Sequence, residues 1–197
     1  VIDPRARIFD PGSITIQNNA SLGSADMSNV GSGLSPSVVN LTIDNNPFLL
    51  SFALDQLQEV TSSVSLTNNP LLTSHSFVSL TNIGSDLTVS AMDALFDLDG
   101  FGSLSQLGGG LTITGNTNLT QFSSLSLLTE IGNNGGGSLT ISNNPSLSDL
   151  IGLSNVMTVN GDLTFDDNDE VTTLDGTNGF EDLMSVTGAL TVTNNDL

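Results

Sequence analysis

The segment LTISNNPSLSDLIGLSNVMTVNGDL, residues 139–163, contains the pattern that decides the fold of this 197-residue chain. It opens with an apolar–polar–apolar triplet, passes through an Asn-rich corner, and ends where the same triplet begins again. The first apolar residues of eight successive copies are 27, 23, 23, 24, 28, 24 and 27 residues apart, a period that indicates a solenoid. The copies are SITIQNNASL at 13, NLTIDNNPFL at 40, SVSLTNNPLL at 63, DLTVSAMDAL at 86, GLTITGNTNL at 110, SLTISNNPSL at 138, DLTFDDNDEV at 162 and ALTVTNNDL at 189.

Each triplet has the period-two alternation of a strand with one buried face. Equivalent residues of successive rungs are expected to stack into ladders, so that the core grows with every repeat. The two strand ladders are Ile14, Leu41, Val64, Leu87, Leu111, Leu139, Leu163 and Leu190, and Ile16, Ile43, Leu66, Val89, Ile113, Ile141, Phe165 and Val192. A third follows the corner (Leu22, Leu49, Leu72, Leu95, Leu119, Leu147, Val171), and a fourth closes each coil (Val60, Ile83, Leu107, Ile131, Val159, Val186).

The corner of each rung carries an asparagine, and Met92 interrupts the column that these residues form. Asn tolerates left-handed backbone and hydrogen-bonds neighbouring main chain, so the column is expected to satisfy turn amides rung after rung. Runs 133–137 and 175–180 are predicted to be loops that leave the coil intact. The column is Asn19, Asn46, Asn69, Asn116, Asn144, Asn168 and Asn195.

The pattern L-x-I-x-x-N-x-x-L…L-x-G-L-x-x-V-x-x-V-x-G-x-L in residues 139–163 resembles the receptor L-domain repeat of the leucine-rich-repeat group. Growth-factor receptor ectodomains and Ecm33-like fungal wall proteins carry that repeat. The resemblance implies an all-β, right-handed parallel β-helix of about eight rungs at a cell surface, with no catalytic residues. We expect residues 1–12 to be a lead-in or cap and residues 13–197 to be one solenoid, uncapped at its carboxyl end.

The charge of the chain is strongly one-sided. It has 21 acidic residues against two Arg and no Lys, a formal net charge of −19, and it has no Cys. Nucleic acid and anionic membrane surfaces are therefore excluded as partners, because both require a basic patch. An acidic surface suits a salty, divalent-rich exterior, so we expect an extracellular or cell-surface location and no membrane insertion.

Few residues can support catalysis. The only imidazole is His75, which falls where a neighbouring rung has Phe52 and is therefore expected to be a packed or edge histidine. Paired carboxylates occur at Asp166, Asp167 and Asp169, but no basic residue lies near them in sequence. We predict a non-enzymatic protein without a cofactor.

Calcium is the one ion that the sequence favours. The segments 97–100 and 175–179 resemble oxygen-rich loops, but their Asp-Gly pairs occupy the same slot as Ile151-Gly152, which indicates a repeat corner. Another acidic run departs from the repeat template and has no basic partner. A possible Ca²⁺ site is therefore predicted at Asp166, Asp167, Asp169 and Glu170.

The outward positions of the triplets are expected to form two hydroxyl-rich columns on a flat sheet, with rungs about 4.8 Å apart. The predicted binding face is Thr15, Thr42, Thr88, Thr112, Thr114, Thr140, Thr164 and Thr191. Some antifreeze β-solenoids order water with such an array, although Thr is also simply a good solvent-facing strand residue.

We predict a structural or adhesive surface module that contacts an extracellular protein, a glycan or another copy of itself. An ice-binding solenoid and a ligand-recognition ectodomain are the alternatives. Arg5 and Arg7 precede the first rung, whereas acidic residues including Asp196 crowd the last two, which favours head-to-tail assembly into a fibre.

Overall fold

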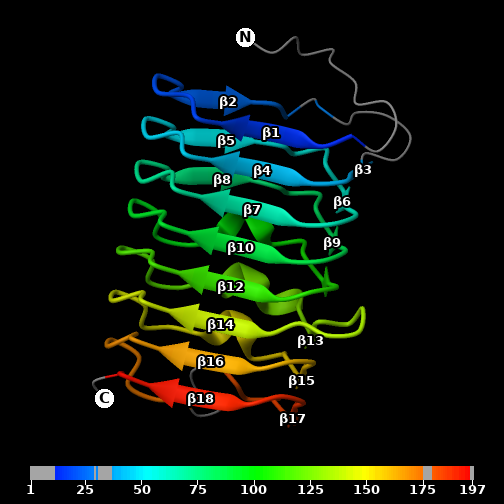
Figure 1. Ribbon diagram of the computed structural model, residues 1–197, viewed down its shortest axis with the longest axis vertical. Helices are drawn as coiled ribbons and strands as arrows, with labels where there is room; N and C mark the ends of the chain where they lie inside the picture. The colour runs from blue at the N-terminus through cyan, green and yellow to red at the C-terminus, as the bar shows by residue number, and fades with distance from the viewer. Residues whose placement is uncertain (1–11, 29, 31–36, 175–178, 196–197) are drawn as a thin grey trace.

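Parallel strands stack along one axis in the computed structural model of the chain, which describes residues 12–28, 30, 37–174 and 179–195. The largest sheet, called the main sheet below, has eight parallel strands, each contributed by one rung (Figure 1). Its strands are β1 (Ile14–Gln17), β4 (Leu41–Asp44), β7 (Val64–Thr67), β10 (Leu87–Ser90), β12 (Leu111–Thr114), β14 (Leu139–Ser142), β16 (Leu163–Asp166) and β18 (Leu190–Thr193).

Two further faces complete each coil. The closing sheet has seven parallel strands: β3 (Ser37–Val38), β6 (Glu59–Val60), β9 (Asn82–Ile83), β11 (Gln106–Leu107), β13 (Glu130–Ile131), β15 (Thr158–Val159) and β17 (Ser185–Val186). The third face begins as a short sheet and continues as a stack of 3₁₀ turns. Its elements are β2 (Ser24–Asp26), β5 (Ser51–Ala53) and β8 (Ser74–Ser76), then η1 (Asp99–Phe101), η2 (Ser123–Leu127) and η3 (Ile151–Leu153).

The predicted parallel β-solenoid is confirmed, with about seven turns between the first and last main-sheet strands. In Figure 1 the main-sheet strands run leftward on the near side, while the short-sheet strands run rightward behind them. Because the chain descends from rung to rung in the same view, the solenoid is right-handed.

The predicted ladders form the core. Register pairs Ile113 with Ile141 and Ile141 with Phe165, and the same in-register pairing holds along the whole main sheet. Ile141 is 1% exposed, and the corner and closing ladders are buried between their end rungs. The carboxyl-terminal layer differs, because Leu190 is 65% and Val192 45% exposed. No described residue packs on that side of β18.

At the Asn corner, one residue adopts the left-handed backbone conformation and the next residue, the ladder Asn, makes the hydrogen bonds between rungs. The residue before each ladder Asn has the positive φ, 53° at Asn45 and 55° at Asn143, whereas the ladder Asn itself is buried in every rung between the end rungs. Asn46 donates its backbone N–H and its Nδ2 to Oδ1 of Asn69, both at 3.0 Å. At the break in the column, Nδ2 of Asn69 lies 3.7 Å from Sδ of Met92. The left-handed residue thus lies one position earlier than the column that the sequence singled out.

Candidate functional site

The outward face of the main sheet carries the predicted column of hydroxyls at the first outward position of each strand. This hydroxyl column points away from the core, because its neighbours on either side in sequence form the buried ladders. None of its side-chain hydroxyls forms a hydrogen bond within the described part of the chain. The column comprises Thr15, Thr42, Ser65, Thr88, Thr112, Thr140, Thr164 and Thr191.

In the second outward column, two residues farther along each strand and called the tied column below, side-chain hydrogen bonds join neighbouring rungs. Thr67 donates its hydroxyl to Asp44 at 2.7 Å, and Thr193 donates to Asp166 at 2.6 Å. Thr114, predicted as part of the binding face, shares a hydrogen bond of 2.9 Å with Ser142. Two neighbouring columns of similar composition therefore differ: every described hydroxyl of the first is unengaged, whereas in the second only that of Ser90 is.

Hydrogen bonds explain why the two acids of the tied column stay ionised. The Asn68 amide and the Thr67 hydroxyl lower the pKa of Asp44 below its usual value. The Thr193 hydroxyl and the Asn194 amide do the same for Asp166. Both carboxylates are therefore fixed negative charges on an otherwise neutral hydroxylated sheet.

The four predicted calcium ligands do not form one cluster. Asp166 lies on the outward face of β16, Asp167 takes the left-handed corner position with φ 55°, and Asp169 and Glu170 are exposed beyond the buried Asn168. Within the described ranges no group of three or more His, Asp or Glu side chains could hold a metal ion. Calcium binding at this run stays a prediction.

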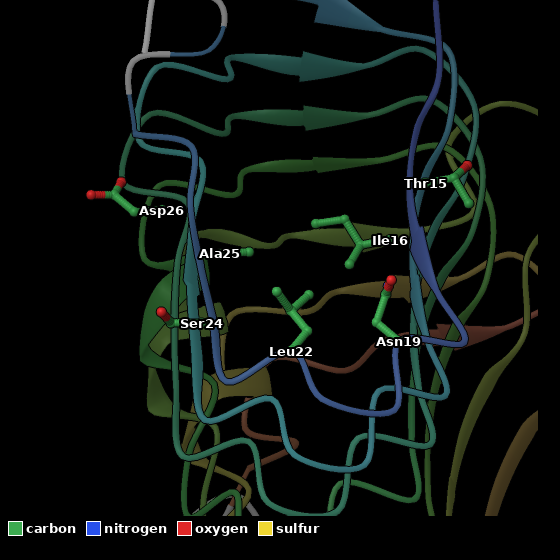
Figure 2. Close-up of a pocket in the computed structure, with 7 residues that line it drawn as sticks. All are labelled: Thr15, Ile16, Asn19, Leu22, Ser24, Ala25 and Asp26. Carbon is green, nitrogen blue, oxygen red and sulfur yellow. The ribbon is translucent and has the colours of Figure 1, made fainter. Parts of the chain in front are cut away.

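The amino-terminal end of the solenoid contains a hollow of about 440 Å³ (Figure 2). Ile16, Leu22 and Ala25 give it apolar walls, and Asn19 lies at its edge. Asn19 donates Nδ2 to Oδ1 of Asn46 at 2.8 Å, but its own Oδ1 accepts from no described residue. The hollow therefore exposes apolar side chains and an Asn Oδ1, the groups through which later rungs contact the preceding ones. The predicted assembly residues Arg5, Arg7 and Asp196 lie outside the described residues.

His75 is buried, as predicted. Its ring lies among Phe52, Phe77 and Phe101, with centroids 6.1, 6.0 and 5.3 Å away, and its Nε2 has no hydrogen-bond partner. Burial lowers the pKa of His75 to about 4, against an opposing effect from Asp97. An imidazole enclosed in this way has no access to a substrate, so it supplies no general base.

Sequence reasoning missed two features of the surface. One is the set of side-chain hydrogen bonds between neighbouring rungs in the second column. The sequence does not show it, because Thr occurs in both columns. The other is a polar hollow beside the loop at 133–137, lined in part by Glu130 and Asn160. A signal for the second was present, because the corner Gly84, Gly108 and Gly132 of three rungs becomes Asn160 and then Thr187 in the next two.

No protein-family model matches this sequence. No solved structure matches this chain either. The resemblance to the receptor L-domain repeat accordingly stays a prediction, and the function has to be argued from the surfaces. Across the described ranges the structure contains no helix with the length and apolar character needed to cross a membrane.

Proposed function

We propose that this chain is a non-enzymatic structural or adhesive module of an extracellular or cell-surface protein. The hydroxyl column supports the proposal: eight side chains, one per rung, point outward from a continuous sheet with no hydrogen-bond partner in the described chain. Their spacing of about 4.8 Å repeats along the axis, so an extended polymer can meet the same group many times. Many weak contacts in a row give avidity without a deep pocket.

Adsorption to extracellular polymers tests this proposal. The double variant Thr112→Val/Thr140→Val removes two hydroxyls from the middle of the column and keeps the β-branched shape. We expect adsorption to fall about tenfold on whichever of cellulose, chitin or collagen retains the unmodified chain, because each lost hydrogen bond contributes about 0.5–1.5 kcal/mol.

Thr158→Val is the matched control, since Thr158 lies in β15 of the closing sheet, away from the column. It should adsorb like the unmodified chain. Adsorption to none of the three polymers, or equal loss in both variants, contradicts the proposal.

Self-association along the axis is part of the same proposal. The exposed Leu190 and Val192 continue the ladders that Ile14 and Ile16 begin at the other end. Where the next rung also has an Asn, the ladder Asn donates its backbone N–H toward the carboxyl end, as Asn168 does to Asn195 Oδ1 at 2.8 Å. The unengaged Oδ1 of Asn19 can therefore receive a donor from a second copy. These complementary ends support head-to-tail contact, which propagates rather than closing as a dimer.

Sedimentation velocity and negative-stain microscopy of the 197-residue chain over a range of concentrations test this contact. Leu190→Asp, which places a charge in the exposed apolar layer, should abolish association. The double variant Arg5→Glu/Arg7→Glu should shorten the fibres at low salt. A monomer at every concentration contradicts end-to-end assembly and leaves the adsorption test independent.

Ice binding is a second candidate, which the straightness and regularity of the hydroxyl column favour. The fixed charges at Asp44 and Asp166 in the adjacent column oppose it, because carboxylates hold water in their own hydration geometry. Thermal hysteresis with crystal faceting supports this candidate, and a freezing point lowered only as much as by an inert protein rules it out.

A further inference from the structure

The corner that follows each closing-sheet strand admits no side chain in three successive rungs. A Cβ at Gly84 would lie 2.2 Å from the carbonyl oxygen of Thr61, and one at Gly108 would lie 2.1 Å from that of Gly84. A Cβ at Gly132 would meet the backbone nitrogen of Gly137 at 2.4 Å. The register places Asn160 and Thr187 at this same corner in the next two rungs. Thr61 occupies the corner in the rung before Gly84, so glycine is confined to three middle rungs and polar side chains return at Asn160.

The loop at 133–137 makes room for those side chains. Asn134 holds the loop against earlier rungs, because its Nδ2 donates to the carbonyl oxygen of Gly84 at 2.9 Å and its N–H to that of Gly108 at 3.0 Å. The loop projects from the solenoid beside β13 (Figure 1). Between it and the following rungs lies a hollow of about 340 Å³, within the range of roughly 300–1,000 Å³ usual for small-molecule sites.

The groups that line this hollow are polar and partly prearranged. Asn160 donates Nδ2 to Oε1 of Glu130 at 2.5 Å, which fixes the carboxylate and turns the amide oxygen of Asn160 away from it. Asn133, Gly135 and Thr187 also line the hollow, and the side chains of Asn133 and Thr187 and the backbone N–H of Gly135 have no hydrogen-bond partner among the described residues. The hollow thus combines one carboxylate, two amides, one hydroxyl and one free backbone N–H.

We propose that this hollow binds a sugar residue, through the vicinal hydroxyls of a pyranose ring. A fixed carboxylate accepts charge-assisted hydrogen bonds from hydroxyls, and an Asn amide donates to one hydroxyl while accepting from another. The single carboxylate and the net charge of −19 disfavour an anionic ligand. One carboxylate in a wide hollow also falls short of the six to eight converging oxygens that Ca²⁺ takes. The proposal does not depend on the hydroxyl column.

Saturation-transfer NMR with the purified chain and a panel of methyl hexosides tests the proposal, with oligosaccharides of the same sugars as a second arm. We expect at least one sugar to give transfer and to shift the amide resonance of Gly135. Response to the methyl glycosides shows that a free or terminal sugar suffices, and response to oligosaccharides alone shows that an internal residue is bound. Either result supports the proposal.

Two variants locate the site. Asn160→Gly restores the residue that this corner has in the three earlier rungs, and Glu130→Gln keeps the shape of the side chain but removes its charge. Each should weaken binding at least tenfold. The control is Glu59→Gln, because Glu59 also accepts a hydrogen bond from an Asn Nδ2 on the closing sheet, that of Asn82 at 2.7 Å, but does not line this hollow.

Three results overturn the proposal. The first is no transfer from any sugar of the panel in either arm. The second is binding that Asn160→Gly and Glu130→Gln leave unchanged, which places the sugar elsewhere. The third is a shift of the Gly135 resonance with calcium chloride alone and none with sugars, which assigns the hollow to a cation.

Discussion

The third face of the solenoid is built in two ways, although both halves share the same main sheet and core. In the amino-terminal half the inward side chains are two residues apart, as in Phe52 and Leu54, and the segment is a strand. In the carboxyl-terminal half they are three apart, as in Leu98 and Phe101, and the segment is a 3₁₀ turn. Strands repeat every two residues and 3₁₀ turns every three. The spacing of two anchors therefore decides the local structure, while the ladders on either side stay in register.

His75 and Gly100 form the junction between the halves. His75 belongs to β8, the last strand of the short sheet, and Gly100 to η1, the first 3₁₀ turn. A Cβ at Gly100 would lie 2.5 Å from Cδ2 of His75, so the imidazole packs directly on the glycine backbone. Phe77 and Phe101 stack across the same boundary at 4.9 Å. The change of structure is thus bridged by continuous aromatic packing.

If the two halves share one core, equivalent ladder residues should contribute equally to the free energy of unfolding. Ile43→Ala in the amino-terminal half and Ile141→Ala in the carboxyl-terminal half should each lower the free energy of unfolding by about 2–5 kcal/mol, because both remove buried methyl and methylene groups. Thr140→Ala, on the outward face beside Ile141, should cost well below about 1 kcal/mol. Urea titration measures all three. A large difference between the two Ile variants means that the halves unfold separately.

The junction should make stability depend on pH. The folded chain keeps His75 neutral down to a pKa of about 4, whereas the unfolded chain binds the proton at its ordinary value of 6.5. This contribution to stability is complete above pH 6.5 and declines as the pH falls from 6.5 to 4, by about 3 kcal/mol in total at about 1.4 kcal/mol per pH unit. The measurement is the urea midpoint as a function of pH.

His75→Leu isolates this effect from the titration of the acidic residues. Leucine already occupies the equivalent position in later rungs, at Leu98 and Leu150. The variant should lose the extra decline between pH 6.5 and 4 and keep the rest of the profile. Identical profiles for both proteins would mean that His75 is solvated in solution.

The 3₁₀ half should depend on glycine where the short sheet does not. A Cβ at Gly152 would lie 2.0 Å from the carbonyl oxygen of Phe122, so Gly152→Ala should cost about 1–3 kcal/mol through forced backbone movement. Gly102→Ala is the control, because its Cβ would have only an ordinary contact at 3.7 Å. Equal thermal midpoints for the two variants contradict the close packing of η3 on the rung above it.

A smaller effect than that of Gly152→Ala should come from deleting Asp99. The deletion changes the spacing of Leu98 and Phe101 from three to two, so the segment should pair with β8 as a fourth strand of the short sheet. We expect stability to change by less than about 2 kcal/mol, with new protection of the Phe101 amide in hydrogen exchange. An unprotected amide would mean that neighbouring rungs, rather than anchor spacing, decide the structure of this face.

The ladders and the Asn corner could be predicted because each is a pattern of residue types at a fixed period. Ile141, for example, is buried because its neighbours in the repeat are also apolar. The tied column could not be predicted in this way, because Thr112 and Thr114 are the same residue and differ only in what lies beside them on the next rung. The sugar-sized hollow depends on where the loop at 133–137 folds back, which the spacing of 28 residues between Leu111 and Leu139 leaves open. The switch to 3₁₀ turns was visible in the anchor spacing.

The stacked rungs also determine how the molecule would respond to force. If its two ends are pulled apart, tension loads the main-sheet hydrogen bonds of the terminal rung first, since each rung contacts only its neighbours. Rungs should then peel away singly, each releasing 23–28 residues, or about 80–100 Å of extended chain. An optical trap should record a staircase of such steps, with a weaker one where Met92 interrupts the amide column.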